Sequence, residues 1–386
     1  MSEFDDFSDD EFGRFVSDTS RRNSDIGFQP PGFEDPSLFH NAVVLNLSSR
    51  TIPGLLDIHE QILGRRFLGS GALFEVFGLV ADVDPNLPQF DGPNAQIADH
   101  SCSDPTMVTA SHRLVAVKRA KIVESRDIHG SCISIRTRTG DQADPDYISL
   151  IYNEVKALDQ LPHPNIVKLL AWGFEEHMGQ GPGQTSRSLV LVMEHALGSA
   201  ERVLQEVQLP WPIRSHLCAG LVAGIKALHG YRIIHGDIKP DNVLIFSTTA
   251  TDFGLVTKVA DFNCSWDGTN IAQVPRGTFG WAAPDVETYD DLSQDLWPKL
   301  IAADSWSLGL TIWSMLFEGG ARIPPSLPSQ YAPKLALILE HADLSKHEFE
   351  RLSPALLQTI DLDPSKRPKE LDTLRRALVT AEADHL

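Results

Sequence analysis

The segment "IIHGDIKPDNVLIF", which spans residues 233–246, has a compact polar centre between two apolar runs. Asp237 can accept the proton of an attacking hydroxyl, and Lys239, two residues later, can neutralise a phosphoryl group during its transfer. Asn242, five residues after the aspartate, can bind a metal ion. A polar turn leading into a strand would not require these residue types, together with His235, at these spacings. The segment therefore favours phosphoryl-transfer chemistry.

Two glycines in "LGSGALFEV" separate two strand-like runs. Because they carry no side chains, Gly69 and Gly71 let the backbone approach phosphate oxygens and direct its N–H groups at them. Gly-x-Gly also ends many ordinary hairpins, so the pattern alone is weak evidence for a phosphate site.

Lys118 ends the apolar run "VAVK", and Glu154 lies within an apolar helical stripe. That stripe consists of Ile148, Ile151, Val155 and Leu158. A charged side chain in such surroundings is costly unless it is paired. The plainer alternative is an edge strand that leaves Lys118 in solvent. A Lys118–Glu154 pair directed at the α- and β-phosphates of a nucleotide accounts for both residues at once.

Two aspartates in "TDFGLVTKVADFNCS" compete for the role of metal ligand beside Asn242. Side chains that share one magnesium ion must lie within a few ångströms of each other, since the ion holds its ligands at about 2.0–2.1 Å. The chain leaves Asn242 along "VLIF" and must turn back. Before Asp252 only "STTAT" could supply the turn and the return, whereas "LVTKVA" before Asp261 can return as an antiparallel strand. Asp261 is therefore the predicted ligand, and "TDFG" the hairpin connection.

The elements that must position these residues change character along the chain, because strand-like runs come first and helical patterns follow. We expect an acidic, disordered tail at 1–55, a β-rich lobe at 56–194 and a helical lobe at 195–386. Two polar stretches in the β-rich lobe, 81–112 and 121–145, are predicted to be irregular insertions. The tail is either a solubilising segment or a docking site for a regulatory partner, and the insertions are either docking sites or tolerated loops.

The composition bounds what the chain can be. Its 386 residues, 42% of them hydrophobic, suffice for one large two-lobed domain. A formal net charge of −19 argues against nucleic acid as a general partner. The four cysteines form no CxxC pair, so we expect neither zinc nor disulfides, and a reduced intracellular protein, cytoplasmic or nuclear. The N-terminus is unlike a secretory signal, and no apolar run approaches a membrane span.

Taken in order, these motifs resemble the eukaryotic protein kinase family over residues 62–378. The sequence adds "GTFGWAAPD", "DSWSLG" and "DPSKRP" in the family's order. The resemblance implies an α+β, bilobal fold, with a small β-rich N-lobe that carries one key helix and a larger helical C-lobe. It further implies that ATP and Mg2+ bind between the lobes and that the substrate is a protein. Lys239 and Thr278, in "GTFG", favour serine or threonine hydroxyls over tyrosine.

The resemblance also assigns a nucleotide site. Its residues are Leu68, Gly69, Ser70, Gly71, Val76, Ala116, Lys118, Met193, Glu194, Ala196 and Leu244. Among them, Met193 is the expected gatekeeper, and the backbone at 194–196 is expected to hydrogen-bond the adenine. The apolar members are equally ordinary core residues by their own pattern, and only the family placement makes them a pocket.

The resemblance gives two further sets of residues structural roles. His235 and Phe262 are expected to stack with Leu158 and Leu169 in an apolar column, the family's regulatory spine. Asp304, in "DSWSLG", is the expected helix acid that anchors the catalytic-loop backbone.

Two departures from the family pattern concern regulation and turnover. Gly236 stands where the family usually has an arginine that receives a phosphate, so we expect phosphorylation between Cys264 and Arg276 not to be required. Phe74 replaces the third loop glycine, which is expected to reduce flexibility over the phosphates and to lower turnover.

Two other departures concern backbone and packing. Asn263 replaces a glycine at a position expected to require positive φ, which asparagine tolerates best among non-glycine residues. Asp285 replaces a glutamate whose expected partner is Arg367. Its shorter side chain leaves two alternatives, a formed pair or an exposed one that contributes less than about 1 kcal/mol.

Three functions compete. The first is an active serine/threonine protein kinase with Asp237 as base. The second is a pseudokinase, an ATP-binding or scaffold module, which Phe74, Gly236 and Asn263 favour slightly. The third is a small-molecule phosphotransferase, because "HGD" followed by an asparagine also occurs in that family; Lys239 and the later motifs argue against it.

Overall fold

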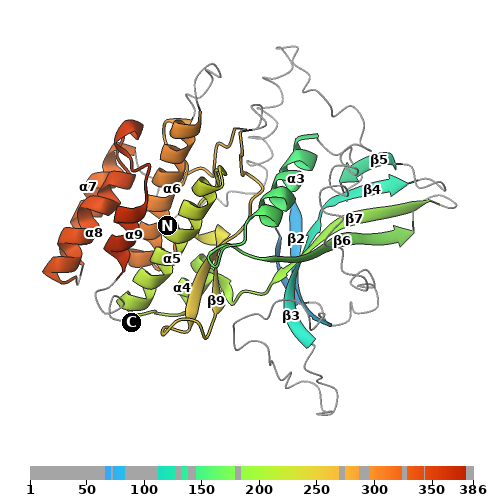
Figure 1. Cartoon of the computed structure of the whole chain (residues 1–386), viewed down its shortest axis with the longest axis horizontal. Helices are drawn as coiled ribbons and strands as arrows, with labels where there is room; N and C mark the ends of the chain where they lie inside the picture. Colours follow the sequence, from blue (N-terminus) through green and yellow to red (C-terminus); the bar gives the residue numbers. More distant parts are fainter. Residues whose placement is uncertain are drawn as a thin grey trace, which may run out of the picture.

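The computed structural model describes residues 66–70, 73–82, 112–126, 132–137, 145–178, 184–268, 274–286, 296–323, 328–342 and 344–379. The predicted tail at 1–55, most of the first insertion and Gly71 lie outside the described residues. Within them the chain forms two lobes, one built on a β-sheet with a single helix and the other on helices around a small sheet (Figure 1). The predicted α+β, bilobal fold is confirmed.

Seven strands form the sheet of the N-lobe. In chain order, β1 to β7 are Arg66–Ser70, Phe74–Asp82, His112–Ala120, Ile122–Arg126, Cys132–Thr137, Leu169–Met178 and Thr185–Glu194. β1, β2, β3 and β7 are antiparallel neighbours in that order, and β6 pairs with the opposite edge of β7. The helix α3, Pro145–Gln160, buries Ile151, Val155 and Leu158 of its apolar stripe in the same core as residues of β6 and β7. The pairing of β3 with β7 places β3 beside the end of β7, where the chain passes to the C-lobe through the hinge.

The second stretch predicted to be irregular contains a β-hairpin instead. β4 follows β3 after a break at Lys121 and pairs with β7 beyond the end of the β3 pairing, while β5 pairs with β4. β5 reads "CISIRT", in which isoleucines alternate with polar or small residues, as strands favour. The surrounding polar residues obscured this alternation, so the loop prediction is wrong over β4 and β5. The outer residues of the first insertion, 81–82 and 112, likewise belong to β2 and β3.

Helices build the C-lobe around a buried centre. They are α4 Ala200–Glu206, α5 Trp211–Gly230, α6 Trp297–Phe317, α7 Pro328–His341, α8 Lys346–Thr359 and α9 Asp372–Leu378. α5 and α6 are apolar along most of their length and contact each other, and α8 and α9 pack against them (Figure 1). The short 3-10 helices η4, Pro240–Asn242, and η7, Pro364–Lys366, complete the lobe.

Among the described helices, α6 has the length and apolar composition of a membrane span. However, 89% of that apolar window is buried inside the protein. The core position explains the composition, because a helix surrounded by protein is apolar on all sides. The expectation that no apolar run approaches the length of a membrane span was therefore wrong for this segment.

The hairpin predicted to return the chain to Asn242 is present. β9, Val243–Ser247, pairs antiparallel with β10, Leu255–Val259, and the short β8, Gly198–Ser199, adds a third strand. Asp252 lies exposed in the connection. At the other end, the backbone N–H of Ala260 donates to the carbonyl of Asn242 at 2.9 Å. The hairpin therefore delivers residue 261, and not residue 252, beside Asn242.

Candidate active site

Lys118 is the centre of an ion cluster that joins three elements. Its Nζ donates to both carboxylate oxygens of Glu154 on α3, at 2.6 and 2.7 Å, and to Oδ1 of Asp261, at 2.7 Å. Lys118 and Glu154 are buried, and the ring of Phe74 lies 4.5 Å from Nζ. The alternative of an edge-strand lysine in solvent is therefore wrong. The fold brings three predicted site residues together from β3, α3 and the segment after β10.

The charges in this cluster do not balance. Burial alone would lower the pKa of Lys118, but Asp261 and Glu154 outweigh it and raise that pKa, so the lysine stays charged. Burial raises the pKa of Glu154 to about 7; Lys118 opposes this rise without cancelling it, and the negative charge of Asp261 adds to it. Burial would also raise the pKa of Asp261, yet Lys118 lowers it overall. One cation facing two acids leaves an excess of negative charge, which suits a cation site.

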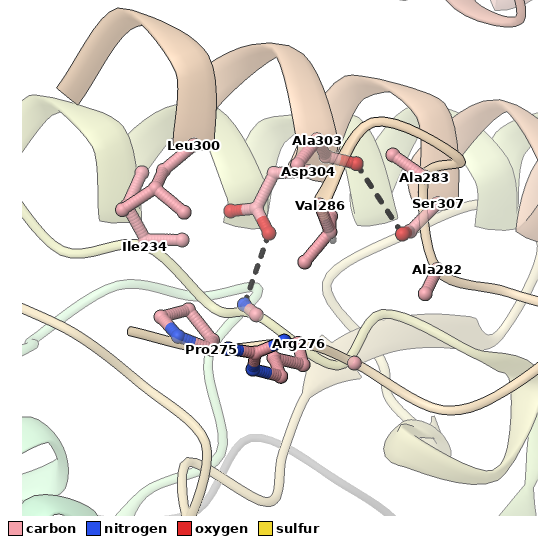
Figure 2. Close-up of a pocket in the computed structure, with 12 residues that line it drawn as sticks. Ile234, Pro275, Arg276, Ala282, Ala283, Val286, Leu300, Ala303, Asp304 and Ser307 are labelled. Atoms are coloured by element: carbon pink, nitrogen blue, oxygen red, sulfur yellow. Dashed lines mark hydrogen bonds between the residues drawn. The ribbon is translucent and has the colours of Figure 1, made fainter. Parts of the chain in front are cut away.

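Asp304 fixes the backbone of the catalytic loop. It extends from α6, where it is only 2% exposed, and accepts from the backbone N–H groups of His235 and Gly236, each at 2.9 Å. Figure 2 shows Asp304 with one of these two bonds. The Nε2 of His229 on α5 lies 2.9 Å from the same carboxylate. The sequence indicated Asp304 as the anchor of this loop, but nothing in its pattern indicated His229.

Asp237, Lys239 and Thr278 form one hydrogen-bonded group. The hydroxyl of Thr278 donates to Asp237 Oδ1 at 2.6 Å and accepts from Lys239 Nζ at 2.8 Å. Lys239 Nζ also lies 2.9 Å from Asp237 Oδ2. Burial alone would lower the pKa of Lys239, but Asp237 outweighs it and raises that pKa, so the lysine is cationic. A carboxylate that can take a proton thus lies beside a fixed positive charge.

Asn242 and Asp261 are the residues whose side chains fit a metal ion. Asn242 Nδ2 donates to the backbone carbonyl of Asp237 at 2.8 Å and to its Oδ2 at 3.1 Å, so the amide oxygen of Asn242 is the atom left for a cation. A carboxylate and an amide oxygen are donors that Mg2+ accepts, with the remaining positions filled by phosphates and water. No cluster of three or more His, Cys, Asp or Glu in the described part of the chain could hold a metal alone.

The backbone strain of this segment lies at Asp261. Its φ is +64°, in the left-handed region that non-glycine residues avoid, although aspartate is among the more tolerant. Asn263 does not have positive φ. The prediction that Asn263 replaces glycine because it tolerates such a backbone is therefore wrong, since the unusual angle occurs two residues earlier.

The residues assigned to the nucleotide line the junction of the sheet and the hinge. Ala116 on β3 pairs with Met193 on β7, and Leu244 on β9 lies across from the second residue of β8. Met193 and Ala116 are buried, whereas the other predicted apolar residues, Leu68, Val76 and Leu244, are half-buried. Gly69 and Ser70 end β1, and Ala196 follows β7 directly after His195. These positions keep the nucleotide assignment as a prediction.

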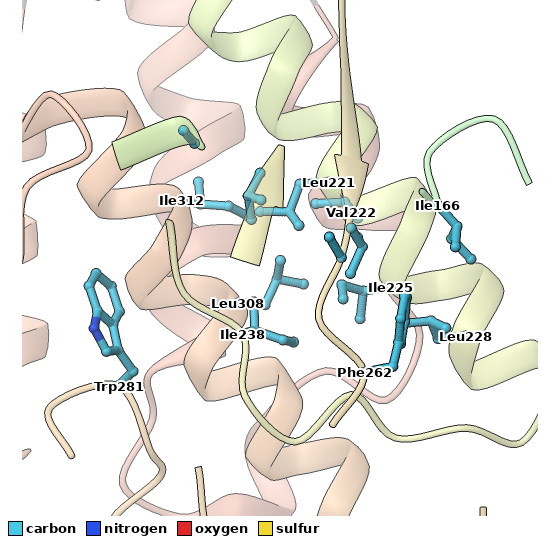
Figure 3. Close-up of a cluster of buried hydrophobic side chains, with 14 of the residues drawn as sticks. Ile166, Leu221, Val222, Ile225, Leu228, Ile238, Phe262, Trp281, Leu308 and Ile312 are labelled. Carbon is cyan, nitrogen blue, oxygen red and sulfur yellow. The ribbon is translucent and has the colours of Figure 1, made fainter. Parts of the chain in front are cut away.

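One contact of the apolar column predicted from the resemblance is present in the core, between His235 and Phe262. The rings of His235 and Phe262 lie 5.4 Å apart, and both side chains are fully buried. Leu158 and Leu169 belong to the same buried cluster as Phe262. Figure 3 shows Phe262 close to Ile225 and Leu228 of α5. The stacking of Leu158 and Leu169 on this pair of rings stays a prediction.

Sequence reasoning missed two ion pairs that cross between elements. Glu194 was predicted only for its backbone, yet its carboxylate binds Lys258 on β10, at 2.7 and 2.6 Å, and accepts from the N–H of Lys168 at 2.8 Å. Lys156 on α3 binds Asp267 in the segment after Phe262. The partners are far apart in sequence, so no spacing pattern could have identified them.

The pair of Asp285 and Arg367 is formed. Arg367 Nη2 donates to Asp285 Oδ1 at 2.6 Å, and the arginine is only 2% exposed. The alternative of an exposed, weak pair is therefore wrong. Breaking such a pair would leave a buried guanidinium without its carboxylate, which costs about 3–5 kcal/mol.

Gly236 lies where the chain could not carry a side chain. Its φ is +77°, and an added Cβ would come 2.4 Å from Cβ of Pro275 and 2.6 Å from the carbonyl oxygen of Cys264. Pro275 lies close below the Asp304 contact in Figure 2. The segment on both sides of residues 269–273 thus packs directly on the catalytic loop, in the space that the family's arginine would occupy.

Known proteins match this chain over the same region. A family model of the protein kinase domain matches residues 113–369. The chain is similar to the probable serine/threonine-protein kinase drkC of Dictyostelium discoideum, at 24% identity over 298 residues, which cover 73% of this chain and 33% of that protein. It is similar to the serine/threonine-protein kinase TAO3 of Homo sapiens, at 32% identity over 242 residues, which cover 59% of this chain and 23% of that protein.

A yeast relative gives the same result. The serine/threonine-protein kinase STE20 of Saccharomyces cerevisiae is 28% identical over 250 residues, which cover 61% of this chain and 23% of that protein. The chain therefore spans about a quarter to a third of the length of these curated relatives. The family model covers well over half of this chain, and its range includes the ion cluster, the catalytic loop and the anchoring helix. The chain belongs to the protein kinase domain family.

Proposed function

We propose that this protein transfers the γ-phosphate of ATP to serine or threonine hydroxyls of protein substrates. The observation that carries the proposal is the hydrogen-bonded group of Asp237, Lys239 and Thr278, which lies beside the Lys118–Asp261 cluster. A family of serine/threonine kinase relatives supports the same reaction. The arrangement unites a proton acceptor, a cation for the transferred group and residues suited to phosphates and metal.

Each residue has a separate task in the proposed reaction. Asp237 accepts the proton of the attacking hydroxyl, while Thr278 and Asn242 hold its carboxylate in a fixed orientation. Lys239 neutralises negative charge on the phosphoryl group, and Lys118 binds the α- and β-phosphates with Glu154 keeping it in place. Asn242 and Asp261 would hold the metal ion, which supplies charge neutralisation for the phosphates when it is bound.

A hollow beside this group supports a peptide substrate. It has a volume of about 230 Å³ and is lined by Lys239, Thr278, Asp241 and Arg322, among others. Glu201, from the first turn of α4, also lines it, and a hydrogen bond with Asp241 raises the pKa of Glu201 to about 7. A side chain of a substrate peptide would fit into such a space next to the proton acceptor.

The pseudokinase alternative loses support from the positions of the departing residues. Phe74 is buried and packs its ring on the ammonium of Lys118, where it stabilises the phosphate-binding lysine. Gly236 leaves the catalytic loop bound to Asp304. The buried Arg367–Asp285 pair and the Thr278 bonds belong to the motifs that separated peptide kinases from small-molecule phosphotransferases in the sequence.

The proposal includes independence from activation-segment phosphorylation. Pro275 packs on Gly236, so the segment meets the catalytic loop by direct contact instead of through an arginine and a phosphate. Asp267 provides a carboxylate that binds Lys156 on α3, two residues after Glu154. A built-in negative charge thereby links the segment to the helix that carries Glu154.

A kinase assay tests the proposal. The purified full chain is incubated with Mg-ATP and a library of serine, threonine and tyrosine peptides, and Asp237→Asn is compared with Asp252→Asn. We expect serine or threonine phosphorylation that falls about 10²- to 10⁴-fold in Asp237→Asn and is unchanged in Asp252→Asn. No transfer by the wild type to any peptide, or transfer only to tyrosine, would contradict the proposed function.

A further inference from the structure

Asn263 occupies a position at which the backbone does not explain it. The residue stands where the resemblance expects glycine, yet its φ is not positive. Any L-residue could therefore adopt this backbone, and alanine would fit it without strain. The reason for an amide at this position must lie in what its side chain contacts.

The side chain makes one hydrogen bond that the structure shows. Asn263 Nδ2 donates to Asp261 Oδ1 at 2.8 Å. An ionised carboxylate only accepts hydrogen bonds, so the nitrogen of the amide must face it and the oxygen must point away. That oxygen, Asn263 Oδ1, is buried with no hydrogen-bond partner in the described part of the chain. A buried acceptor without a partner costs free energy, so the bond to Asp261 is made at the expense of stability.

The bond acts on a residue that is itself strained. Asp261 has φ of +64°, and a non-glycine residue remains in such a conformation only when its surroundings hold it there. Two donors do so. Lys118 Nζ and Asn263 Nδ2 both donate to Oδ1, at 2.7 and 2.8 Å. Oδ2 receives neither of these bonds. The two donors thereby fix the rotation of the carboxylate and keep one oxygen directed away from the lysine.

The two donors differ in what they can do. Lys118 is shared with Glu154 and, in the proposed reaction, with the phosphates of the nucleotide. Asn263 is two residues from Asp261, so its bond closes a short loop of backbone and depends on no other element. The Asn263 bond to Asp261 is therefore independent of the contacts that Lys118 makes with Glu154 and, in the proposed reaction, with phosphates.

From these contacts we propose that Asn263 is a positioning residue, whose amide holds Asp261 in the orientation that binds the metal ion. The inference rests on the proposed function, because it takes Asp261 as a metal ligand. The substitution of glycine by asparagine then exchanges a freely rotating backbone for a side-chain restraint on the aspartate. The residue acts through Asp261 and does not touch the substrate.

Manganese binding to the full chain tests this inference directly. The dissociation constant of Mn2+ is measured by electron paramagnetic resonance in the presence of a non-hydrolysable ATP analogue, and nucleotide affinity is measured separately without metal. The variants are Asn263→Ala, Asn263→Leu and Asp261→Asn. Alanine removes the donor, and leucine removes the donor and the orphaned oxygen but keeps a similar volume. Asp261→Asn tests whether Asp261 is a ligand at all.

We expect both Asn263 variants to bind Mn2+ about tenfold more weakly, as the loss of one hydrogen bond to a charged group predicts. Their metal-free nucleotide affinity is expected to be unchanged, and their melting temperatures to be equal to or above that of the wild type. High Mg2+ concentrations should restore most of the turnover. This combination of weaker metal binding and undiminished stability would not arise from a packing role.

Other outcomes separate the two claims. If Asn263→Leu keeps the wild-type Mn2+ affinity, or if both variants lose stability and metal binding in parallel, the positioning role is wrong and the side chain serves packing. If Asp261→Asn also leaves Mn2+ binding unchanged, the fault lies in the proposed metal site itself.

Discussion

The chain contains two nearly identical three-residue motifs, Asp252-Phe253-Gly254 and Asp261-Phe262-Asn263, in different surroundings. Asp252 is exposed in the connection between β9 and β10, with Gly254 in the left-handed region at φ +68°. Asp261 is bonded to Lys118 and lies at the end of the returning strand. The first motif, which matches the family's Asp-Phe-Gly, lies in a turn. The second motif, which departs from it at Asn263, forms part of the candidate site.

The two phenylalanines show the same contrast. Phe253 is half-buried, with its ring 5.0 Å from that of His216 on α5. Phe262 is fully buried and contacts the ring of His235 in the central core. Topology therefore decides the role of each motif, because only the second motif follows a strand that returns to the catalytic loop. A motif becomes a site only where the fold brings its partners to it.

The largest expected difference is catalytic. Replacing Asp261 by asparagine removes a charged ligand from the cluster, and we expect kcat with a serine or threonine peptide to fall about 100- to 1000-fold. The same change at Asp252 alters only a surface turn and is expected to leave kcat within about twofold. Steady-state assays at saturating Mg-ATP provide the measurement. Loss of activity in Asp252→Asn with a normal Asp261→Asn would show that the hairpin assignment is wrong.

The next difference is in stability. Phe262→Ala removes a fully buried ring and is expected to lower the free energy of unfolding by about 3–5 kcal/mol. Phe253→Ala removes a half-buried ring with one aromatic neighbour and is expected to cost about 1 kcal/mol. Urea unfolding at equal protein concentration measures both. Equal losses in the free energy of unfolding would contradict the view that only the second motif belongs to the core.

Exchanging the third residues of the two motifs is expected to have a smaller effect on the protein. It separates the influence of the motif's sequence from that of its position in the fold. The double variant Gly254→Asn with Asn263→Gly turns the first motif into Asp-Phe-Asn and the second motif into the family's Asp-Phe-Gly. Catalysis is expected to remain dependent on Asp261, and the affinity for Mn2+ to fall about tenfold through loss of the Asn263 bond. The test adds Asp252→Asn or Asp261→Asn to the double variant. If dependence moved to Asp252, spelling and not position would determine the site.

The sequence predicted the parts of the site that depend on local spacing or on a forced return of the chain. Lys118 and Glu154 were identified because each was a charged residue in an apolar pattern, and Asp261 because only its strand could return to Asn242. These arguments need only strand and helix periods and the reach of the chain.

The rest depends on contacts between distant segments or on backbone angles. The β4–β5 hairpin was missed because its alternation is short and polar residues surround it. The ion pair of Lys258 with Glu194 joins residues 64 positions apart, which no period connects. The positive φ was expected at Asn263 and occurs at Asp261, because side-chain bonds in the folded cluster determine which residue is strained.

The smallest expected difference concerns the third residues of the two motifs, Gly254 and Asn263. Gly254 has positive φ, and an added Cβ would meet only the carbonyl of Thr248 at 3.9 Å, so space is not limiting. Gly254→Ala is expected to lower the free energy of unfolding by about 1 kcal/mol through backbone strain alone. Gly254→Asn is expected to recover part of this loss, because asparagine tolerates the left-handed region better.

Asn263→Ala is the matched comparison, because the backbone there accepts any L-residue. Alanine is expected to leave stability unchanged or slightly higher at 263, since it removes the orphaned oxygen, and to lower it at 254. Urea unfolding of the three variants without nucleotide measures stability apart from metal binding. A loss of stability in Asn263→Ala with no loss in Gly254→Ala would show that the strained backbone lies at residue 263 and not at residue 254. It would also restore the original reading, in which asparagine at 263 serves the backbone and not Asp261.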